Sequence, residues 1–169
     1  MSHSLLIKNT AAFAKKCHKH QTRKTGEPYF THPEAVAKSV MQWTKDPHVI
    51  VAAYLHDVIE DCGRDYEDLL ERFGVRVARY VAGASRDFRK PKEESMHLFR
   101  RDLVAASPEI KLIVAADIAH NASTPADSAF MKLWFRKTRA TLPYLIRGNL
   151  GTYRKAILSL TQHIESLVR

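Results

Sequence analysis

Four ionisable residues lie close together at one end of the otherwise apolar segment Val49–Asp61. His56 and Asp57 are neighbours, and Glu60 and Asp61 follow on the face of Asp57, one helical turn further along. A helix this apolar belongs in the centre of a domain. Because ionisable groups there are costly unless they pair or bind a metal, we expect this helix to be both the core and the floor of a site.

The pair His56-Asp57 offers two types of metal ligand from adjacent positions. Neighbours on a helix point about 100° apart, yet both side chains can reach one ion that lies over the helix surface. An imidazole and a carboxylate together suit Mn²⁺, Fe²⁺ or Zn²⁺. The dipeptide alone is a weak signal, so the metal hypothesis needs further ligands.

Two residues elsewhere in the chain strengthen this hypothesis. His32 stands before Pro33 at the start of a predicted helix, and Asp117 is the lone acid inside the apolar run IVAADIAHN. An unpaired carboxylate in such a run is costly. Two histidines and two aspartates from three elements could complete a metal site with positions left for water. The alternative is that His32 is a surface residue and that Asp117 pairs with an arginine.

Glu60 and Asp61 could take or deliver a proton at such a site. The alternative is a solvated, acidic helix end, but acids at a helix C-terminus oppose the helix dipole, which favours a functional role. Asn121 follows Asp117 by four residues and shares its face. Its amide could hydrogen-bond a substrate or cap the end of the helix.

Helical periodicity runs through the chain and glycine is scarce, which predicts an all-α bundle built as a single domain over residues 1–169. The loop QTRKTGEPYF carries Arg23 and Lys24. We expect helices over about 5–20, 31–43, 49–61, 66–73, 75–85, 92–106 and 109–121, from 128 onward and from 152 onward. A loop is expected over 122–127.

Three local signals place helix boundaries. Thr31 with a glutamate three residues later resembles a capping box. Asp46 followed by Pro47 marks the start of the central helix, with the aspartate as cap. Pro143 is expected to interrupt the basic helix that begins near Ser128.

The composition is that of a globular chain, with 45% hydrophobic and 27% charged residues. No apolar run reaches membrane-spanning length and the N-terminus lacks a signal-peptide pattern, so we expect a cytoplasmic protein with no membrane contact. The net charge of +9 is concentrated in residues 128–169, which contain eight Lys or Arg and one acid, Glu165. This excess indicates nucleotide phosphates or a nucleic acid as partner, or else a solvated helix face.

These residues, in this order, resemble the HD-domain superfamily of metal-dependent phosphohydrolases, and within it the RelA/SpoT hydrolase domain. The opening of that domain is similar to the segment from Ala14 to Pro33, which includes Arg23, Lys24 and His32. AAYLHDVIEDC resembles A-A-x-L-H-D-x-x-E-D-T, FGVRVARYVAGAS resembles F-G-x-x-V-x-x-L-V-x-G-V-T, and AADIAHNAST resembles L-A-D-R-L-H-N-M-R-T. The likeness covers residues 5–145 and resembles a small alarmone hydrolase, the class that includes metazoan SpoT-like enzymes.

The resemblance implies a role for each candidate residue. The ligands of one Mn²⁺ would be His32, His56, Asp57 and Asp117. The catalytic carboxylates would be Glu60 and Asp61. The substrate-binding residues would be Arg23 at the base, Lys24 near phosphate, and Asn121 and Thr124 lining the nucleotide pocket. The implied reaction removes the 3′-pyrophosphate of (p)ppGpp, the alarmone of the stringent response, and leaves GDP or GTP and pyrophosphate.

Three positions depart from the family pattern. Val114 stands where the family usually has Lys, Ser123 where it has Arg, and Cys62 where it has Thr. The first two changes remove positive charge near the expected pocket and leave the metal ligands and carboxylates intact. We therefore expect hydrolysis to be retained, while the substrate could be a guanosine alarmone, the adenine alarmone (p)ppApp, or NADPH or a related nucleotide cleaved by a phosphatase activity.

The basic C-terminal helices leave two further interpretations open. Arg136, Lys137 and Arg139 could replace the missing charge at the pocket. Alternatively, the chain could be a non-catalytic module that binds nucleic acid or a protein partner through these helices. The complete set of ligands and carboxylates argues against such a module. We expect a monomer or homodimer that acts on a small nucleotide and binds no nucleic acid.

Overall fold

A computed structural model describes residues 2–124 and 128–168, and the side chains of 2–124 and 134–168. These residues form no named strand, so the predicted all-α fold is confirmed; Thr22 and Pro28 form an isolated bridge. The last part of the loop predicted over 122–127 lies outside the described residues. The helices are α1 (His3–Cys17), α2 (Thr31–Met41), α3 (Pro47–Leu55), α4 (Val58–Asp61), α5 (Tyr66–Phe73), α6 (Val75–Ala84), α7 (Lys92–Ala105), α8 (Pro108–Ala122), α9 (Ser128–Leu145), the 3-10 helix η1 (Gly151–Tyr153) and α10 (Arg154–Leu167).

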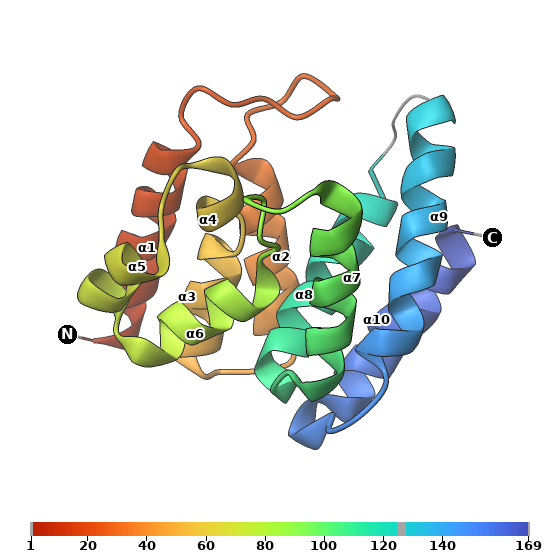
Figure 1. Cartoon of the computed structure of the whole chain (residues 1–169). Coiled ribbons are helices and arrows are strands. Elements are labelled where there is room, and N and C mark those ends of the chain that lie inside the picture. Colours follow the sequence, from red (N-terminus) through yellow and green to blue (C-terminus); the bar gives the residue numbers. More distant parts are fainter. Residues whose placement is uncertain (1, 125–127, 169) are drawn as a thin grey trace.

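Helix α3 is the centre of the bundle, as its composition predicts (Figure 1). It contacts α1, α2, α6 and α8, and every residue from Val49 to Leu55 is buried. Its start is also as predicted, because the Asp46 carboxylate accepts a hydrogen bond from the His48 amide at 2.9 Å and Pro47 is the first helical residue. Burial on all sides explains why this segment has no polar face.

The prediction of one continuous helix over 49–61 is wrong. Helix α3 ends at Leu55, and after a break at His56 and Asp57 the chain begins the short helix α4. Asp57, with φ −95° and ψ −5°, is the residue before α4, and its carbonyl accepts from the Asp61 amide at 2.8 Å. The acids at 60 and 61 therefore belong to a four-residue helix of their own, so the argument from the dipole of a long helix does not hold.

Two smaller expectations about helix ends are also wrong. The Thr31 hydroxyl donates to the Pro28 carbonyl at 2.9 Å, and α2 begins after Phe30 without a side-chain cap, so there is no capping box. Pro143 does not interrupt α9, although it has no amide proton for the Arg139 carbonyl; the helix continues for two more residues and ends at Leu145.

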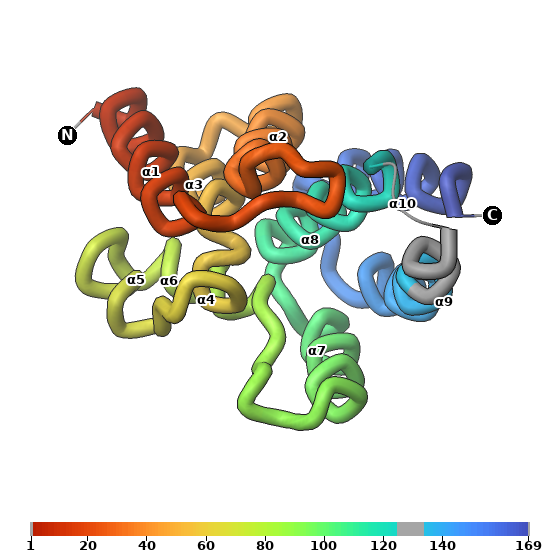
Figure 2. Tube along the Cα trace, turned by 90° about the horizontal axis from the view of Figure 1, so that it is seen from above, coloured from red at the N-terminus to blue at the C-terminus, as the bar shows by residue number. Residues whose placement is uncertain are grey.

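The second half of the chain packs beside this centre. Helix α8 contacts α2, α6 and α10, and α7 packs against α9. Seen from above, the segment between α1 and α2 crosses over the bundle toward the end of α8, while α7 stands apart from α5 and α6 (Figure 2). Among the described residues, no helix has both the length and the apolar character needed to cross a membrane.

Candidate active site and metal centre

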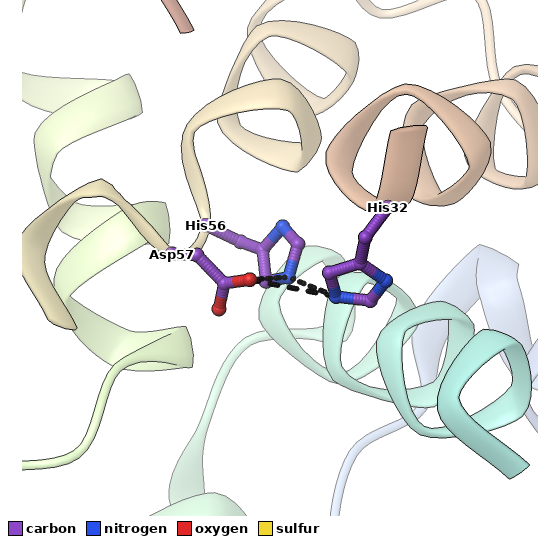
Figure 3. Close-up of side chains that lie close together, drawn as sticks. All are labelled: His32, His56 and Asp57. Carbon is purple, nitrogen blue, oxygen red and sulfur yellow. Dashed lines mark hydrogen bonds and ion pairs between the residues drawn. The ribbon is translucent and has the colours of Figure 1, made fainter. Parts of the chain in front are cut away.

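Three potential metal ligands converge at the break between α3 and α4. His32 comes from the first turn of α2, and His56 and Asp57 form the break itself (Figure 3). One donor atom from each of the three lies within 4.8 Å of the other two. Both imidazoles are buried, with exposed fractions of 1% for His32 and 4% for His56. The break allows two consecutive side chains to face the same point, which a straight helix does less well.

Asp117 of α8 adds a fourth donor from the opposite side. Its Oδ1 lies 3.0 Å from His32 Nε2 and 3.6 Å from His56 Nε2. Asp57 Oδ2 lies 3.4 and 3.2 Å from the same two nitrogens, which are 3.2 Å apart. Ligand atoms that share one ion at bond lengths of about 2.0–2.2 Å are separated by roughly 3.0–3.5 Å, so His32, His56 and Asp57 fit a single divalent ion, and Asp117 lies beside the same two imidazoles.

The outward nitrogen of each histidine is held by a further hydrogen bond. Nδ1 of His56 lies 2.9 Å from the Ala53 carbonyl, to which it donates, so Nε2 is left as the free donor atom. Nδ1 of His32 lies 2.8 Å from Nδ1 of His120 on α8. Partners of this kind fix the tautomer and ring orientation of a metal-binding histidine. Both rings therefore present Nε2 toward the two aspartates.

The charges at this cluster call for a cation. Burial lowers the pKa of His56, but Asp57 and Asp117 outweigh it and raise the pKa well above its usual value. Burial raises the pKa of Asp117, but hydrogen bonds from His32 and His56 prevail and lower it well below its usual value. Two half-buried carboxylates thus draw positive charge toward the imidazoles, and a divalent ion would supply that charge.

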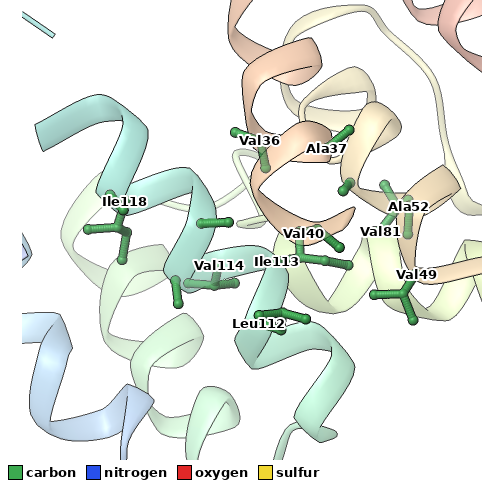
Figure 4. Close-up of a cluster of buried hydrophobic side chains, with 14 of the residues drawn as sticks. Val36, Ala37, Val40, Val49, Ala52, Val81, Leu112, Ile113, Val114 and Ile118 are labelled. Carbon is green, nitrogen blue, oxygen red and sulfur yellow. The ribbon is translucent and has the colours of Figure 1, made fainter. Parts of the chain in front are cut away.

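Apolar packing holds the three ligand-bearing helices in place. Val36, Ala37 and Val40 on α2 and Ala52 on α3 belong to the same buried cluster as Ile113 of α8 (Figure 4). All five side chains have exposed fractions of zero. A close-packed core has little freedom to shift, so the apolar residues of these helices fix the separation of the donor atoms.

Asp61 is linked to Asp57 by Tyr29, a residue to which no role was assigned from sequence. We refer to His32, His56, Asp57 and Asp117 together as the metal cluster. The Tyr29 hydroxyl lies 2.9 Å from Asp57 Oδ2 and 2.7 Å from Asp61 Oδ2. Burial, followed by the charges of the two aspartates, raises the pKa of Tyr29 far above its usual value, so the phenol keeps its proton. Burial also raises the pKa of Asp61, although the hydrogen bond from Tyr29 opposes this.

Glu60 is held by Arg86, which lies just after α6. The Arg86 amide donates to Glu60 Oε1 at 2.7 Å, its Nε donates to the same oxygen at 3.3 Å, and its Nη2 pairs with Oε2. Burial raises the pKa of Glu60, and the interactions with Arg86 oppose that rise. The carboxylate is thus oriented toward the cavity edge and shielded from most of the solvent.

Three of the four predicted substrate-binding residues meet beside the metal cluster. Arg23 donates to Asn121 Oδ1 at 3.1 Å and to Thr124 Oγ1 at 3.2 Å. Asn121 in turn donates to Asp117 Oδ1 at 2.7 Å, so the predicted shared face of α8 is real. The fourth residue, Lys24, is exposed on the same loop as Arg23.

A cavity of about 390 Å³ opens from the metal cluster toward α7 and α9. Its floor contains His56, Asp57, Glu60, Asp61 and Asp117, and its far wall is basic and aromatic, with Lys92, Phe99, Trp134 and Lys137. Of the three basic residues considered as replacements for the missing charge, Lys137 lines the cavity, while Arg136 and Arg139 are exposed and do not. Val114 also lines the wall, which makes that side apolar.

Sequence reasoning missed three residues of the site: Tyr29, Arg86 and His120. Tyr29 and His120 lie inside the segments that carry the family resemblance. Tyr29 comes three residues before His32, and His120 directly precedes Asn121. Their hydrogen-bond partners, however, come from distant parts of the chain. Arg86 directly follows the segment VAGAS. No spacing rule links it to Glu60, since the two are 26 residues apart and meet only through packing of α6 on α3.

A helical fold with a histidine–aspartate group that could hold a metal ion, flanked by acids, is typical of HD domains, and a family comparison agrees. The chain belongs to the HD domain family, whose model matches residues 10–129. The resemblance inferred from the motifs is therefore confirmed.

Curated relatives add detail. The bifunctional (p)ppGpp synthase/hydrolase SpoT of Escherichia coli K12 is 41% identical over 117 residues, which is 66% of this chain and 17% of the relative. A guanosine-3′,5′-bis(diphosphate) 3′-pyrophosphohydrolase of Aquifex aeolicus is 38% identical over 125 residues, 72% of this chain and 18% of the relative. The chain thus spans under a fifth of the length of these relatives.

A solved structure matches the chain over nearly its whole length. It is described as a metazoan ortholog of SpoT that hydrolyses ppGpp and plays a role in starvation responses. The two are 26% identical with a TM-score of 0.79, and the match covers 93% of this chain and 94% of the other. The chain is therefore similar in extent, as well as in fold, to that protein.

Proposed function

We propose that this chain is a metal-dependent hydrolase that removes the 3′-pyrophosphate of (p)ppGpp. The observation that carries the proposal is the convergence of two histidines and two aspartates beside a cavity that Glu60 and Asp61 also line. The relatives named as (p)ppGpp hydrolases and the full-length similarity to a structure described as hydrolysing ppGpp support it. The proposed cellular location is the cytoplasm, and the proposed unit is a single domain acting as monomer or homodimer.

We assign His32, His56, Asp57 and Asp117 as the residues that would hold one ion, with Mn²⁺ as the proposed metal. Such an ion, when bound, lowers the pKa of coordinated water and polarises a phosphoryl oxygen. The four side chains need no large rearrangement for this, since their donor atoms already lie 3.0–3.6 Å apart across the two histidines.

The two acids divide the proton transfers. Glu60 orients a water molecule and takes its proton as the water oxygen bonds to the phosphorus next to the ribose 3′ oxygen. The bond between that phosphorus and the ribose oxygen breaks, and pyrophosphate leaves. Asp61, with the raised pKa that burial gives it, assists delivery of a proton to the ribose oxygen, which becomes a hydroxyl. One water is consumed, and GDP or GTP and pyrophosphate are released.

The remaining residues bind the nucleotide. Arg23 would contact the base and Lys24 a phosphate, while Asn121 and Thr124 line the nucleotide pocket beside the ribose. Lys92 and Lys137 on the far wall of the cavity supply positive charge for further phosphates. Val114 and Ser123 lack the positive charge that the family has at these positions. The proposed substrates therefore include the guanine alarmone, the adenine alarmone and NADPH, and a substrate test distinguishes them.

A parallel substrate test decides among these nucleotides. The purified protein is incubated with ppGpp, ppApp and NADPH, each with Mn²⁺ and with EDTA, and the products are separated by anion exchange. We expect Mn²⁺-dependent release of pyrophosphate from ppGpp. Release from ppApp alone would move the base preference to adenine, and orthophosphate from NADPH alone would replace the proposal with a nucleotide phosphatase.

A further inference from the structure

Arg86 hydrogen-bonds both carboxylate oxygens of Glu60, the residue proposed to activate water. Both oxygens of this carboxylate are occupied, one by the Arg86 amide and Nε and the other by Nη2. A carboxylate in this state has a bidentate partner and is a poor proton acceptor. The arrangement therefore suits a resting enzyme more than one in the act of catalysis.

The backbone and the side chain of Arg86 hold Glu60 in separable ways. The backbone amide bond to Oε1 is fixed by the fold, since the neighbouring Ser85 hydroxyl lies 2.8 Å from the Val81 carbonyl and 3.2 Å from the His56 carbonyl and donates its one proton to either of them. The guanidinium is not fixed in this way. It lies at the cavity wall with 39% of the side chain exposed, so it can turn away while the amide keeps Glu60 in place.

The guanidinium is a positive group in a part of the cavity that is otherwise acidic. It lines the same cavity as Asp57 and Asp117, whose charges also act on it. A pyrophosphate group that reaches the metal cluster through this cavity passes Arg86 and brings more negative charge than a single carboxylate. Arginine binds phosphate in bidentate geometry, so the anion can compete for the guanidinium.

We propose that Arg86 exchanges partners during turnover: it pairs with Glu60 in the free enzyme and with the pyrophosphate group in the substrate complex. The exchange frees Glu60 Oε2 to accept a proton only when substrate is present and places the guanidinium against the group that leaves. This inference rests on the proposed function, in which the departing group is pyrophosphate.

The test is a double-mutant cycle on binding of inorganic pyrophosphate to the Mn²⁺-loaded protein, measured by titration calorimetry. The four proteins are the unchanged chain, Arg86→Gln, Glu60→Gln and the double variant. We expect Arg86→Gln to weaken binding about 10- to 100-fold, as for loss of a charge-assisted pair. Glu60→Gln should tighten binding about 10-fold, because the anion no longer competes with a carboxylate for the guanidinium.

The double variant separates exchange from simple charge repulsion. Removing the Glu60 charge helps an anion in any background, but release of Arg86 helps only where Arg86 is present. We therefore expect Glu60→Gln to tighten binding by less than about threefold in the Arg86→Gln background. An equal effect of Glu60→Gln in both backgrounds, or unchanged binding by Arg86→Gln, would overturn the exchange.

Two controls keep the result interpretable. Arg89→Gln alters an arginine three residues along the same loop, which is 88% exposed and pairs with Asp87, and it should leave pyrophosphate affinity unchanged. Arg86→Lys keeps the charge without the bidentate fork and should give an intermediate affinity if Arg86→Gln does not fold. Because free pyrophosphate is the probe, this test does not depend on ppGpp turnover. Coupling between Arg86 and Glu60 without ppGpp turnover would reject the proposed substrate and retain the partner exchange. Turnover of ppGpp without such coupling would retain the proposed substrate and reject the exchange.

Discussion

The Tyr29 hydroxyl lies 2.9 Å from the Asp57 carboxylate, which places a phenol directly behind a residue of the metal cluster. The same hydroxyl lies 2.7 Å from Asp61. Its single proton can serve only one carboxylate at a time. Tyr29 thus ties the orientation of a proposed metal ligand to that of a proposed catalytic acid, and the ring is held by stacking on His18 with centroids 4.8 Å apart.

Tyr29→Phe should therefore weaken metal binding and turnover together without unfolding the protein. The phenyl ring keeps the stacking contact, while Asp57 and Asp61 lose a shared donor. We expect about a 10-fold loss of Mn²⁺ affinity, the lower end of what removing a hydrogen bond behind a metal ligand costs, together with a lower kcat. Metal titration and steady-state kinetics measure these, with Tyr144→Phe on α9 as control. Unchanged metal affinity would show that Tyr29 does not help to orient Asp57 for metal binding.

Asp57→Ala should abolish both turnover and stabilisation by metal. At a free Mn²⁺ concentration 100 times the dissociation constant, binding contributes about 2.7 kcal/mol to the free energy of unfolding, or roughly 5–10 °C in Tm. Thermal unfolding with and without Mn²⁺ should show this rise for the unchanged chain and for the surface control Asp102→Ala. A full rise in the Asp57→Ala protein would show that the ion binds elsewhere.

The pH dependence of kcat/KM should report on Arg86, because it reflects the free enzyme, in which Arg86 pairs with Glu60. Glu60 accepts a proton only when ionised, so activity is lost as the pH falls through its pKa. Burial raises the pKa of Glu60 and Arg86 lowers it, so removal of the guanidinium leaves the rise unopposed. We expect the acid limb of the Arg86→Gln profile to lie at higher pH than that of the unchanged chain. A limb at the same or lower pH would contradict Glu60 as the titrating base.

Arg23→Ala should act on substrate binding more than on chemistry. Arg23 contacts Asn121 and Thr124, and neither of these is a proposed metal ligand. We expect KM for ppGpp to rise about 10- to 100-fold, as for loss of charge-assisted hydrogen bonds, with a smaller change in kcat. Lys19→Ala, at an exposed position just after α1, is the control. An unchanged KM would show that Arg23 does not contact the base.

Lys111→Met should lower stability and spare the site. Lys111 is fully buried on α8, and its ammonium donates to the Val104 carbonyl at 3.1 Å and to the Arg147 carbonyl. Methionine would leave both carbonyls without this donor, at a cost of about 2–4 kcal/mol in the free energy of unfolding. Chemical denaturation measures the loss, and Mn²⁺ affinity should stay within about twofold. A loss below about 0.5 kcal/mol would show that water replaces the ammonium.

The sequence predicted the parts of the fold and site that depend on composition and local order. The apolar run from Val49 to Leu55 and the lone acid at 117 were sufficient to place two buried helices and the residues that meet between them. The break after Leu55 was not predictable, because His56 and Asp57 have no helix-breaking chemistry. The break depends on tertiary packing, which the helix propensities of these two residues do not indicate.

The supporting contacts were out of reach for the same reason. Tyr29 reaches Asp57 across 28 residues, and His120 reaches His32 across 88. Such pairs depend on how α2, α3 and α8 pack, and single positions in one sequence do not reveal them. What could be read directly was residue type at the site, while the hydrogen bonds that orient those residues required the structure.

Metal stoichiometry of ppGpp hydrolysis tests the central claim most directly. The metal-free protein is titrated with Mn²⁺, and pyrophosphate release from ppGpp is measured at each point beside the amount of bound metal. We expect no release without metal, a linear rise to one ion per chain, and a plateau beyond it, with Asp57→Ala inactive throughout. Release without metal, or no release with one ion bound, would contradict a single-metal alarmone hydrolase.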